Sequence, residues 1–297
     1  MFPDWYPKYK NFVSVSIEEF INSKFSKRNS KPLEILKEAT LYSIKWWKRL
    51  RAILALEFFL IYRKKELKDL TLNDDITKFV IALEIIHAFS LVHDDMPAMD
   101  DDEYRRGNLT TRKKYNEYTA LLVGDLCNTL PFEILSSIED KKVAIDLIRL
   151  LSKSIWFYGM IWWQMEDLYY EIEEKKLNIS DLKSLQAKKT WALIKASSLW
   201  WWILAWVDNS ILNKIEKYAN SIGLAFQIKD DLLDVEWDLE TTGKSVWWEN
   251  KWFVYSIWLE ESKKYLNKLI EKSLELANFF WSEKLEFITL YIKDRVK

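Results

Sequence analysis

The chain has 297 residues, of which 49% are hydrophobic, so it can bury a sizeable core in one large domain or in two. Its formal net charge of −1 excludes nucleic acid as the expected partner, because no basic excess is available to neutralise phosphates along a duplex. Cys127 is the only cysteine, which rules out an intrachain disulfide. Together with a start that lacks the apolar segment of a signal peptide, this leads us to expect a cytoplasmic protein.

Hydrophobic residues recur at helical spacing along most of the chain, and no alternation long enough to predict a strand is present. The segments predicted to be helical are, in chain order, a short one around Ile17 to Phe25, an amphipathic one from Pro32 to Ile44, then Phe79 to Val92, Ala120 to Ser136, Lys142 to Tyr158, Ile161 to Tyr170 and Ile222 to Val235, with amphipathic helices at the C-terminal end. The apolar run from Leu199 to Val207 is too short to span a bilayer, so no stable membrane insertion is expected. Without a long linker or repeat, we expect a single all-α domain over residues 1–297.

A dense cluster of carboxylates follows the apolar segment that ends at Val92. It consists of Asp94, Asp95, Asp100, Asp101 and Asp102, is interrupted by the helix breaker Pro97, and is followed by Arg105 and Arg106. Carboxylates this dense repel one another unless a cation lies among them, and Mg²⁺ takes oxygen ligands of this kind. Guanidinium groups match phosphate oxygens in a two-point contact. The pattern predicts a phosphorylated substrate bridged to the protein by Mg²⁺, although an isolated acidic run is more often a solvated loop.

A second acidic cluster makes the solvated-loop interpretation less plausible. It lies within the apolar segment from Ile222 to Val235 and consists of Gln227, Asp230, Asp231 and Asp234. Residues three and four apart share one face of a helix, so these carboxylates are predicted to lie together. Two acidic faces on otherwise apolar helices are costly unless they share a ligand.

These residues carry a specific resemblance to a known family. Asp94, Asp95 and Asp100, in the form D-D-x-x-x-x-D before R-R-G, resemble the first aspartate-rich motif of the trans-prenyl diphosphate synthases, and D-D-x-x-D after Gln227 resembles the second. The chain is most similar to the bacterial farnesyl and geranylgeranyl diphosphate synthases. The resemblance implies a single large helical bundle of the isoprenoid synthase type, in which the two motifs face each other across a central cavity and hold three Mg²⁺ ions on an allylic diphosphate. It also implies a homodimer.

The same resemblance assigns roles to residues outside the aspartate motifs. The string K-W-W-K-R-L-R resembles a family motif that binds isopentenyl diphosphate through Lys48 and Arg51, with His87 and Arg106 beside them. Residues matched to binding of the allylic diphosphate or to catalysis are Arg105, Gln164, Lys189, Thr190, Gln227 and Lys244. Without the resemblance, the basic string would be an exposed turn and a lone helical histidine would be a core residue.

The resemblance implies that the diphosphate of an allylic substrate leaves and isopentenyl diphosphate attacks the resulting cation. An aromatic residue at the position of Phe89 shortens the product in this family, so farnesyl diphosphate is expected, whereas the small Ser90 beside it leaves geranylgeranyl diphosphate open. A non-catalytic subunit of a heteromeric synthase is the other open alternative. A terpene cyclase is disfavoured because it needs no second diphosphate site.

Tryptophan and glycine occur in unusual proportions. The chain has 17 Trp and 5 Gly, and the two types together make up about the 7% that glycine alone usually contributes. The tryptophans that fall where the resembling family carries glycine are Trp46, Trp47, Trp162, Trp163, Trp191, Trp237, Trp247 and Trp258. We therefore hypothesise that UGA codons of this gene are read as glycine, and that most of these tryptophans are glycine in the cell.

Overall fold

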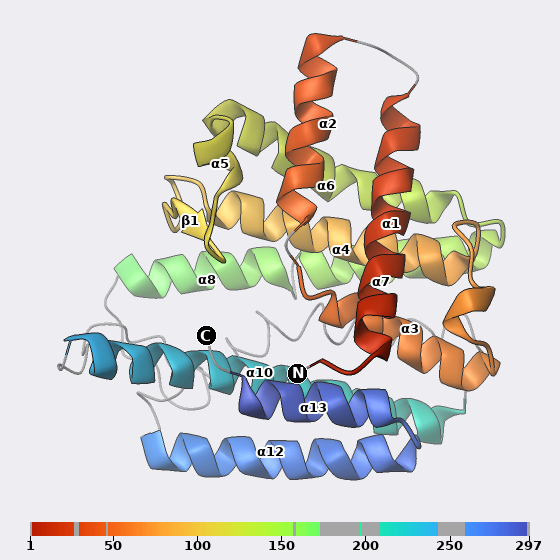
Figure 1. Ribbon diagram of the computed structural model, residues 1–297, viewed down its shortest axis with the longest axis vertical. Helices are drawn as coiled ribbons and strands as arrows, with labels where there is room; N and C mark the ends of the chain where they lie inside the picture. Colours follow the sequence, from red (N-terminus) through yellow and green to blue (C-terminus); the bar gives the residue numbers. More distant parts are fainter. Residues whose placement is uncertain are drawn as a thin grey trace. The chain divides into compact units, whose positions relative to one another are not determined.

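The computed structural model describes residues 2–26, 30–45, 47–156, 159–172, 197, 208–242 and 259–295 (Figure 1). The chain divides into two compact units, one formed by Met1–Ile148 with Ile203–Ala205 and the other by Arg149–Trp202 with Trp206–Lys297. Both units are built from helices in the part described, so the all-α prediction is confirmed. The single domain expected over residues 1–297 stays a prediction.

The first unit contains most of the helices. They are α1 (Trp5–Phe25), α2 (Lys31–Ile44), α3 (Leu50–Arg63), the 3₁₀ helix η1 (Leu67–Asp69), α4 (Asp75–Asp94), α5 (Thr111–Lys114) and α6 (Glu117–Ser136), and α7 (Lys141–Ile155) leads from the first unit into the second. A small antiparallel hairpin of β1 (Tyr104–Arg105) and β2 (Asn108–Leu109) lies between α4 and α5. Its turn residues Arg106 and Gly107 both have positive φ, of 54° and 75°, as the tightest hairpin turns require.

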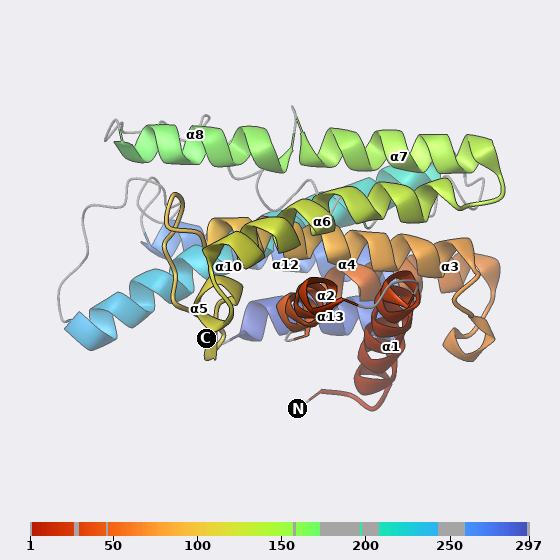
Figure 2. The same cartoon turned by 90° about the horizontal axis from the view of Figure 1, so that it is seen from above.

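Helix α4 forms the core of the first unit. It is apolar on nearly every face and buried along most of its length, and it packs most extensively against α6, with α3 next (Figures 1 and 2). Gly124 on α6 allows this close approach, because a Cβ atom there would lie 2.0 Å from Nε2 of His93 on α4. Among the helices described, only α4 is long and apolar enough to cross a membrane, and 78% of that stretch is buried inside the protein. A core helix has these properties.

The second unit, in its described part, consists of amphipathic helices of varied length. They are α8 (Met160–Ile172), α10 (Asn209–Thr242), α12 (Leu259–Phe279) and α13 (Glu283–Asp294). Helices α10, α12 and α13 pack against one another. The hydroxyl of Tyr218, a fully buried residue of α10, donates to the Leu285 carbonyl oxygen at 2.9 Å and so joins α10 to α13.

Two predicted helix boundaries are wrong. Helix α1 begins at Trp5 rather than near Ile17, because its buried stripe starts with Tyr6 and Tyr9, whose hydroxyl groups made the segment look polar. Helix α10 begins at Asn209, well before the predicted start at Ile222. The end of α4 at Asp94, just before Pro97, agrees with the prediction.

Candidate active site

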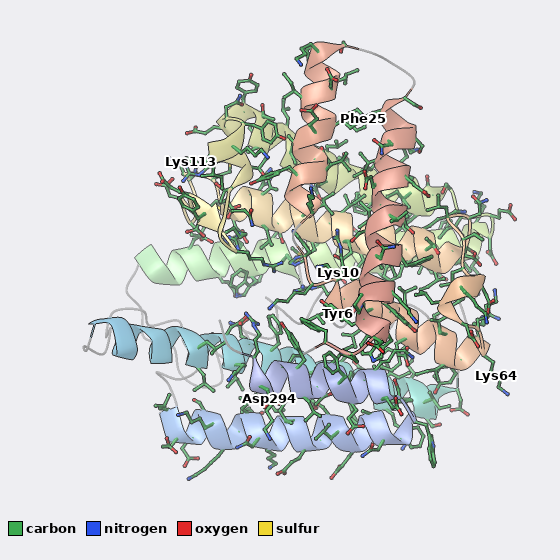
Figure 3. All side chains as sticks on the ribbon, in the orientation of Figure 1. Tyr6, Lys10, Phe25, Lys64, Lys113 and Asp294 are labelled. Carbon is green, nitrogen blue, oxygen red and sulfur yellow. The ribbon has the colours of Figure 1, made fainter. Side chains whose placement is uncertain are left out.

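The basic string of the sequence forms the turn between α2 and α3. Arg51 lies in the first turn of α3, and its Nη1 atom is 3.1 Å from Nε2 of His87 on α4. The carbonyl oxygen of Lys48 accepts a hydrogen bond from the hydroxyl of Tyr6 at 2.7 Å, and Figure 3 shows Tyr6 at the start of α1. The turn is thus fixed at one end by α1 and at the other by α4. Lys48, Arg51 and His87, predicted to act together, belong to one region of the first unit.

His87 is electrically neutral in this setting. Burial holds its pKa well below the usual value, and the positive charges of the surrounding arginines lower the pKa further. These arginines are, in decreasing order of effect, Arg51, Arg106, Arg105 and Arg49. Because Arg51 can only donate, the Nε2 atom of a neutral His87 is the acceptor of their hydrogen bond.

The Trp47 ring packs against two of these residues, His87 and Arg106. Its ring lies edge-on to the His87 ring, with centroids 4.0 Å apart, and the guanidinium of Arg106 lies 5.7 Å from the Trp47 ring centroid. A small pocket beside these residues is also lined by Asp95 and Arg105. The indole therefore occupies space next to the groups predicted to bind a diphosphate.

The first aspartate cluster lies at the C-terminal end of α4. Asp94 is the last residue of the helix, and its carbonyl oxygen accepts from the Asp100 amide at 2.9 Å, which folds the loop back on the helix end. Asp95 is 4% exposed, and burial raises the pKa of its carboxyl group, an effect that the charge of Arg105 opposes. Nε of Arg105 donates to Oδ1 of Asp95 at 2.6 Å. The structure thus brings together Asp94, Asp95, Asp100 and Arg105.

Arg112, which sequence reasoning missed, holds this loop from the protein side. Its side chain is 7% exposed and donates to the carbonyl oxygens of Asp95 (2.6 Å), Asp102 (3.1 Å) and Asp101 (2.6 Å). It also forms an ion pair with the Asp101 carboxylate at 2.6 Å. In the sequence it belongs to the basic stretch T-T-R-K-K, which resembles a solvated helix start and gives no signal of burial.

The second cluster lies on α10 in the other unit. Gln227 donates from Nε2 to Oδ1 of Asp231 at 2.8 Å, and both side chains are buried. Oδ1 of Asp230 lies 2.6 Å from Nη1 of Arg295, a partner that the sequence did not indicate. Asp234 lies in the same helix, and its side chain is outside the described residues.

The remaining predicted residues are distributed as follows. Gln164 is half-buried in α8, whereas Lys189, Thr190 and Lys244 lie outside the described residues. Phe89 is 8% exposed and packs edge-on against His93, with ring centroids 5.1 Å apart. The Ser90 hydroxyl donates to the His87 carbonyl oxygen at 2.9 Å, so this hydroxyl is hydrogen-bonded within α4 itself.

Comparison with known proteins identifies the family. A sequence model of the polyprenyl synthetase family matches residues 33–272. The chain belongs to the polyprenyl synthetase family. It is 38% identical to the farnesyl diphosphate synthase of Micrococcus luteus over 230 residues, covering 74% of this chain and 77% of that protein. It is 35% identical to the farnesyl diphosphate synthase of Haemophilus influenzae over 244 residues, covering 79% and 78%.

Solved structures of this family share the fold. A FPP/GFPP synthase from Zymomonas mobilis aligns with a TM-score of 0.81 at 30% identity, covering 96% of this chain and 99% of that one. A geranyltransferase from Legionella pneumophila aligns with a TM-score of 0.79 at 25% identity, covering 97% and 94%. The predicted isoprenoid synthase fold is therefore confirmed.

The acidic residues of this polyprenyl synthetase suit Mg²⁺ by their chemistry. Asp94, Asp95 and Asp100 offer only oxygen ligands, which hard divalent cations prefer. Burial and the neighbouring carboxylates of Asp102 and Asp100 raise the pKa of the Asp95 carboxyl and Arg105 lowers it, so a cation at this cluster would act in the same direction as Arg105. Among the described residues, no three His, Cys, Asp or Glu side chains already converge as a complete metal site. The donor set thus fits Mg²⁺ by its chemistry.

Proposed function

We propose that this member of the polyprenyl synthetase family condenses isopentenyl diphosphate with dimethylallyl and geranyl diphosphate to give farnesyl diphosphate. One observation carries the proposal. Helix α4 presents His87, in contact with Arg51, and ends at Asp94 seven residues further on, two helical turns or about 10 Å away, with Asp95 directly after it. A cationic group and a carboxylate group at this spacing suit two diphosphates that react with each other.

The cationic group suits the diphosphate of isopentenyl diphosphate. Lys48, Arg51 and Arg106 supply positive charge without a metal, and His87 offers a ring whose neutral form holds Arg51 in place. Guanidinium groups bind phosphate oxygens in pairs, which also orients the ligand. We expect this group to bind and orient the substrate whose double bond attacks.

The carboxylate groups suit an allylic diphosphate held through Mg²⁺. The residues that would hold the ions, three by resemblance to the family, are Asp94, Asp95, Asp100, Asp230, Asp231 and Asp234. Bound Mg²⁺ would supply the positive charge that makes the diphosphate a leaving group. Gln227 orients Asp231 through its hydrogen bond of 2.8 Å, and Arg105 holds Asp95 at 2.6 Å. Gln164, Lys189, Thr190 and Lys244 keep the allylic-site roles that the family resemblance predicts.

Two observations support the fifteen-carbon product. The relatives from Micrococcus luteus and Haemophilus influenzae are both named farnesyl diphosphate synthase. Phe89, on α4 and just before the aspartates, is bulky and buried, as a residue that limits chain length should be. Geranylgeranyl diphosphate is the second candidate product, because a geranylgeranyl diphosphate synthase of Cyanophora paradoxa is 36% identical over 217 residues.

We also propose a cytoplasmic homodimer. Cys127 is the only cysteine of the sequence, so no intrachain disulfide is possible, which suits a reducing compartment. Tyr118, Leu121 and Leu122 are exposed on one face of α6, at a spacing that aligns them on the helix. A second copy of the chain would cover this apolar face. Light scattering of the purified protein at micromolar concentration should give the mass of two chains, and Leu122→Glu should give that of one.

A condensation assay with Mg²⁺, isopentenyl diphosphate and either dimethylallyl or geranyl diphosphate tests the enzymatic proposal. It is run on the chain as written and on a version with glycine at the family-matched tryptophans, with products separated by chain length. Farnesyl diphosphate from either version supports the proposal. If both versions fold and neither forms a product, the chain is a non-catalytic subunit instead.

A further inference from the structure

A buried ion pair lies directly beneath the turn that carries Lys48 and Arg51. Nη1 of Arg49 is 3.0 Å from Oε2 of Glu84, and the two side chains are 2% and 1% exposed. Nη2 of Arg49 also donates to the carbonyl oxygen of Ile44 at 2.7 Å. The other carboxylate oxygen of Glu84 accepts from the Ala52 amide at 3.3 Å. One pair of side chains therefore ties together the end of α2, the start of α3 and the middle of α4.

The backbone at this point adopts a conformation that needs such support. Arg49 caps the N-terminus of α3 with φ of +57°, a left-handed conformation that few residues other than glycine adopt. Unfavourable backbone conformations persist where the surrounding structure fixes them, and they concentrate at functional sites. The contacts of the Arg49 guanidinium provide this fixation.

A gain in stability does not by itself explain why a buried ion pair is present here. Removing two charges from water is costly, and replacing a buried ion pair by well-packed apolar residues is often neutral or stabilising. What the pair does fix is the position of the neighbouring residues proposed to bind the diphosphate. Lys48 precedes Arg49 directly, Arg51 follows two residues later, and His87 lies one helical turn from Glu84 on α4.

We propose that Arg49 and Glu84 are positioning residues that set the geometry of the isopentenyl diphosphate site. They touch no substrate themselves. By fixing the turn against α4, they place Lys48 and Arg51 at a defined distance from His87. The inference rests on the proposed function, because it names which of the two substrates depends on this pair.

Glu84→Gln tests the inference, because it keeps the shape of the side chain and removes its charge. The KM for isopentenyl diphosphate should rise about tenfold or more, since small displacements of binding groups have large effects. The KM for geranyl diphosphate and the apparent affinity for Mg²⁺ should stay within about twofold of the wild type, because the hydrogen bonds that Arg49 and Glu84 make beyond each other go to Ser14, Ile44 and Ala52, outside the aspartate loop.

Glu57→Gln is the matched control. Glu57 is a buried carboxylate of α3, 3% exposed, and accepts a hydrogen bond from Tyr9 at 3.1 Å away from the turn. Its loss should lower the melting temperature without changing the KM ratio of the two substrates. If Glu57→Gln and Glu84→Gln change both KM values alike, the pair is merely structural and the inference is wrong.

A double variant covers the case in which Glu84→Gln does not fold. Arg49→Met with Glu84→Met removes both charges, so no uncompensated charge remains buried. It should fold and still show the raised KM for isopentenyl diphosphate, and a wild-type KM would overturn the inference. Absence of turnover in the parent protein, both as written and with glycine at the family-matched tryptophans, would contradict the proposed function, whereas an active parent with unaltered variants contradicts only this inference.

A second, independent observation concerns Trp281. It follows α12 and Phe280, has φ of +52° and is 95% exposed. The Ser282 amide donates to the Ala277 carbonyl oxygen at 3.3 Å, and the Trp281 amide donates to that of Asn278 at 3.0 Å. This pair of bonds is the Schellman motif, in which the residue at the place of Trp281 is usually glycine. A bulky side chain in this conformation is an outlier.

We infer that Trp281 is glycine in the protein that the cell makes, and that UGA codons of this gene are read as glycine. A fully exposed indole at a strained position gains no packing energy that would offset the strain. The composition agrees, with 17 Trp against 5 Gly. So does Trp47, whose ring lies against His87 within the proposed diphosphate site. Glycine at both positions would relieve the strain at one and uncover the site at the other.

Mass spectrometry of the protein from its own source decides this inference. A C-terminal peptide with glycine at 281 supports it, and one with tryptophan overturns it. As a physical check, Trp281→Gly in the chain as written should raise the melting temperature. Phe279→Gly, which replaces a half-exposed aromatic residue at the end of α12, should lower it, because it removes the contacts of that ring with Phe280 and with the Lys214 ammonium. A lower melting temperature for both variants would contradict the inference.

Discussion

Nη1 of Arg51 lies 3.1 Å from Nε2 of His87, and this contact joins the turn before α3 to the core helix α4. His87 is buried and neutral, so it accepts the hydrogen bond and fixes the direction of the guanidinium. A guanidinium held in a fixed direction suits the two-point contact with a diphosphate that we propose for Arg51. The contact therefore relates a core residue to the binding of substrate.

Arg51→Lys should weaken the binding of isopentenyl diphosphate. Lysine keeps the charge but lacks the planar fork that can bind His87 and a phosphate at once. A hydrogen bond between charged groups contributes about 1.5–3 kcal/mol, which corresponds to a rise in KM of roughly tenfold to hundredfold. Steady-state kinetics with each substrate varied in turn measures the effect. Arg63→Lys, at the end of the same helix, serves as the control, and equal KM values for both variants would refute the role of Arg51.

The stability of the free protein should decrease as the pH falls below about 6.5. Burial and the nearby arginines lower the pKa of His87 below 6.5 in the folded state, whereas the unfolded chain titrates near that value. Below it the unfolded state binds more protons, so the contribution of His87 is fully present above the unfolded-state pKa and is lost toward the folded one. Urea unfolding at about pH 8 and pH 5.5 should show a decrease of about 1 kcal/mol that His87→Gln removes. An equal decrease in His87→Gln would assign the effect to other groups.

Arg112 should govern the geometry of the aspartate loop. Its guanidinium binds the carbonyl oxygens of Asp95, Asp101 and Asp102, so Arg112→Met should release the loop and lower kcat by about 100-fold. Raising the Mg²⁺ concentration should recover part of the activity, and Arg112→Lys should retain more of it than Arg112→Met. The same assay at several Mg²⁺ concentrations checks this, with Lys113→Met, an exposed neighbour, as control. Loss of activity that no Mg²⁺ concentration changes would point to misfolding.

Phe89→Ala should lengthen the product. The truncation removes most of a bulky, buried ring on α4 without touching the carboxylates at the helix end. Chromatography should show a twenty-carbon product replacing much of the fifteen-carbon one, with turnover of the shorter substrates reduced less than about tenfold. Phe58→Ala, a fully buried phenylalanine of α3, should cost comparable stability and leave the product unchanged. An unchanged product from Phe89→Ala would show that another residue limits chain length.

Sequence reasoning gave the helical nature of the chain and the end of α4, because hydrophobic period and proline are local signals. It could not give the full extent of α1, whose buried stripe begins with Tyr6 and Tyr9. Tyrosine has an apolar ring and a polar hydroxyl, so the sequence does not show whether it is buried. In the folded protein the hydroxyls of Tyr6 and Tyr9 bond to Lys48 and Glu57, which allows both rings to be buried. The strands β1 and β2 have two residues each and are too short to show an alternation.

The candidate site likewise contains residues that the sequence indicated and residues that only the structure reveals. Carboxylates at fixed spacing indicated Asp94 and Asp95, because the residue types themselves imply the chemistry, whereas only the family resemblance indicated Arg51 and His87. Of the residues that hold them in place, Arg49 and Arg112 lie in basic stretches that indicate exposure, and Glu84 interrupts an apolar run that does not indicate its partner. Their role comes from contacts between segments far apart along the chain, and a single sequence contains no direct record of those contacts.

The central claim is that one diphosphate is held by protein cations and the other through Mg²⁺ and carboxylates. Isothermal titration of the folded protein, with glycine at the family-matched tryptophans, tests it most directly. One ligand is isopentenyl diphosphate and the other is geranyl thiodiphosphate, which does not react readily, and each is titrated with Mg²⁺ and then with EDTA. We predict that isopentenyl diphosphate binds equally under both conditions and that the allylic analogue binds only with Mg²⁺. Binding of both ligands without Mg²⁺, or of neither, would contradict the claim.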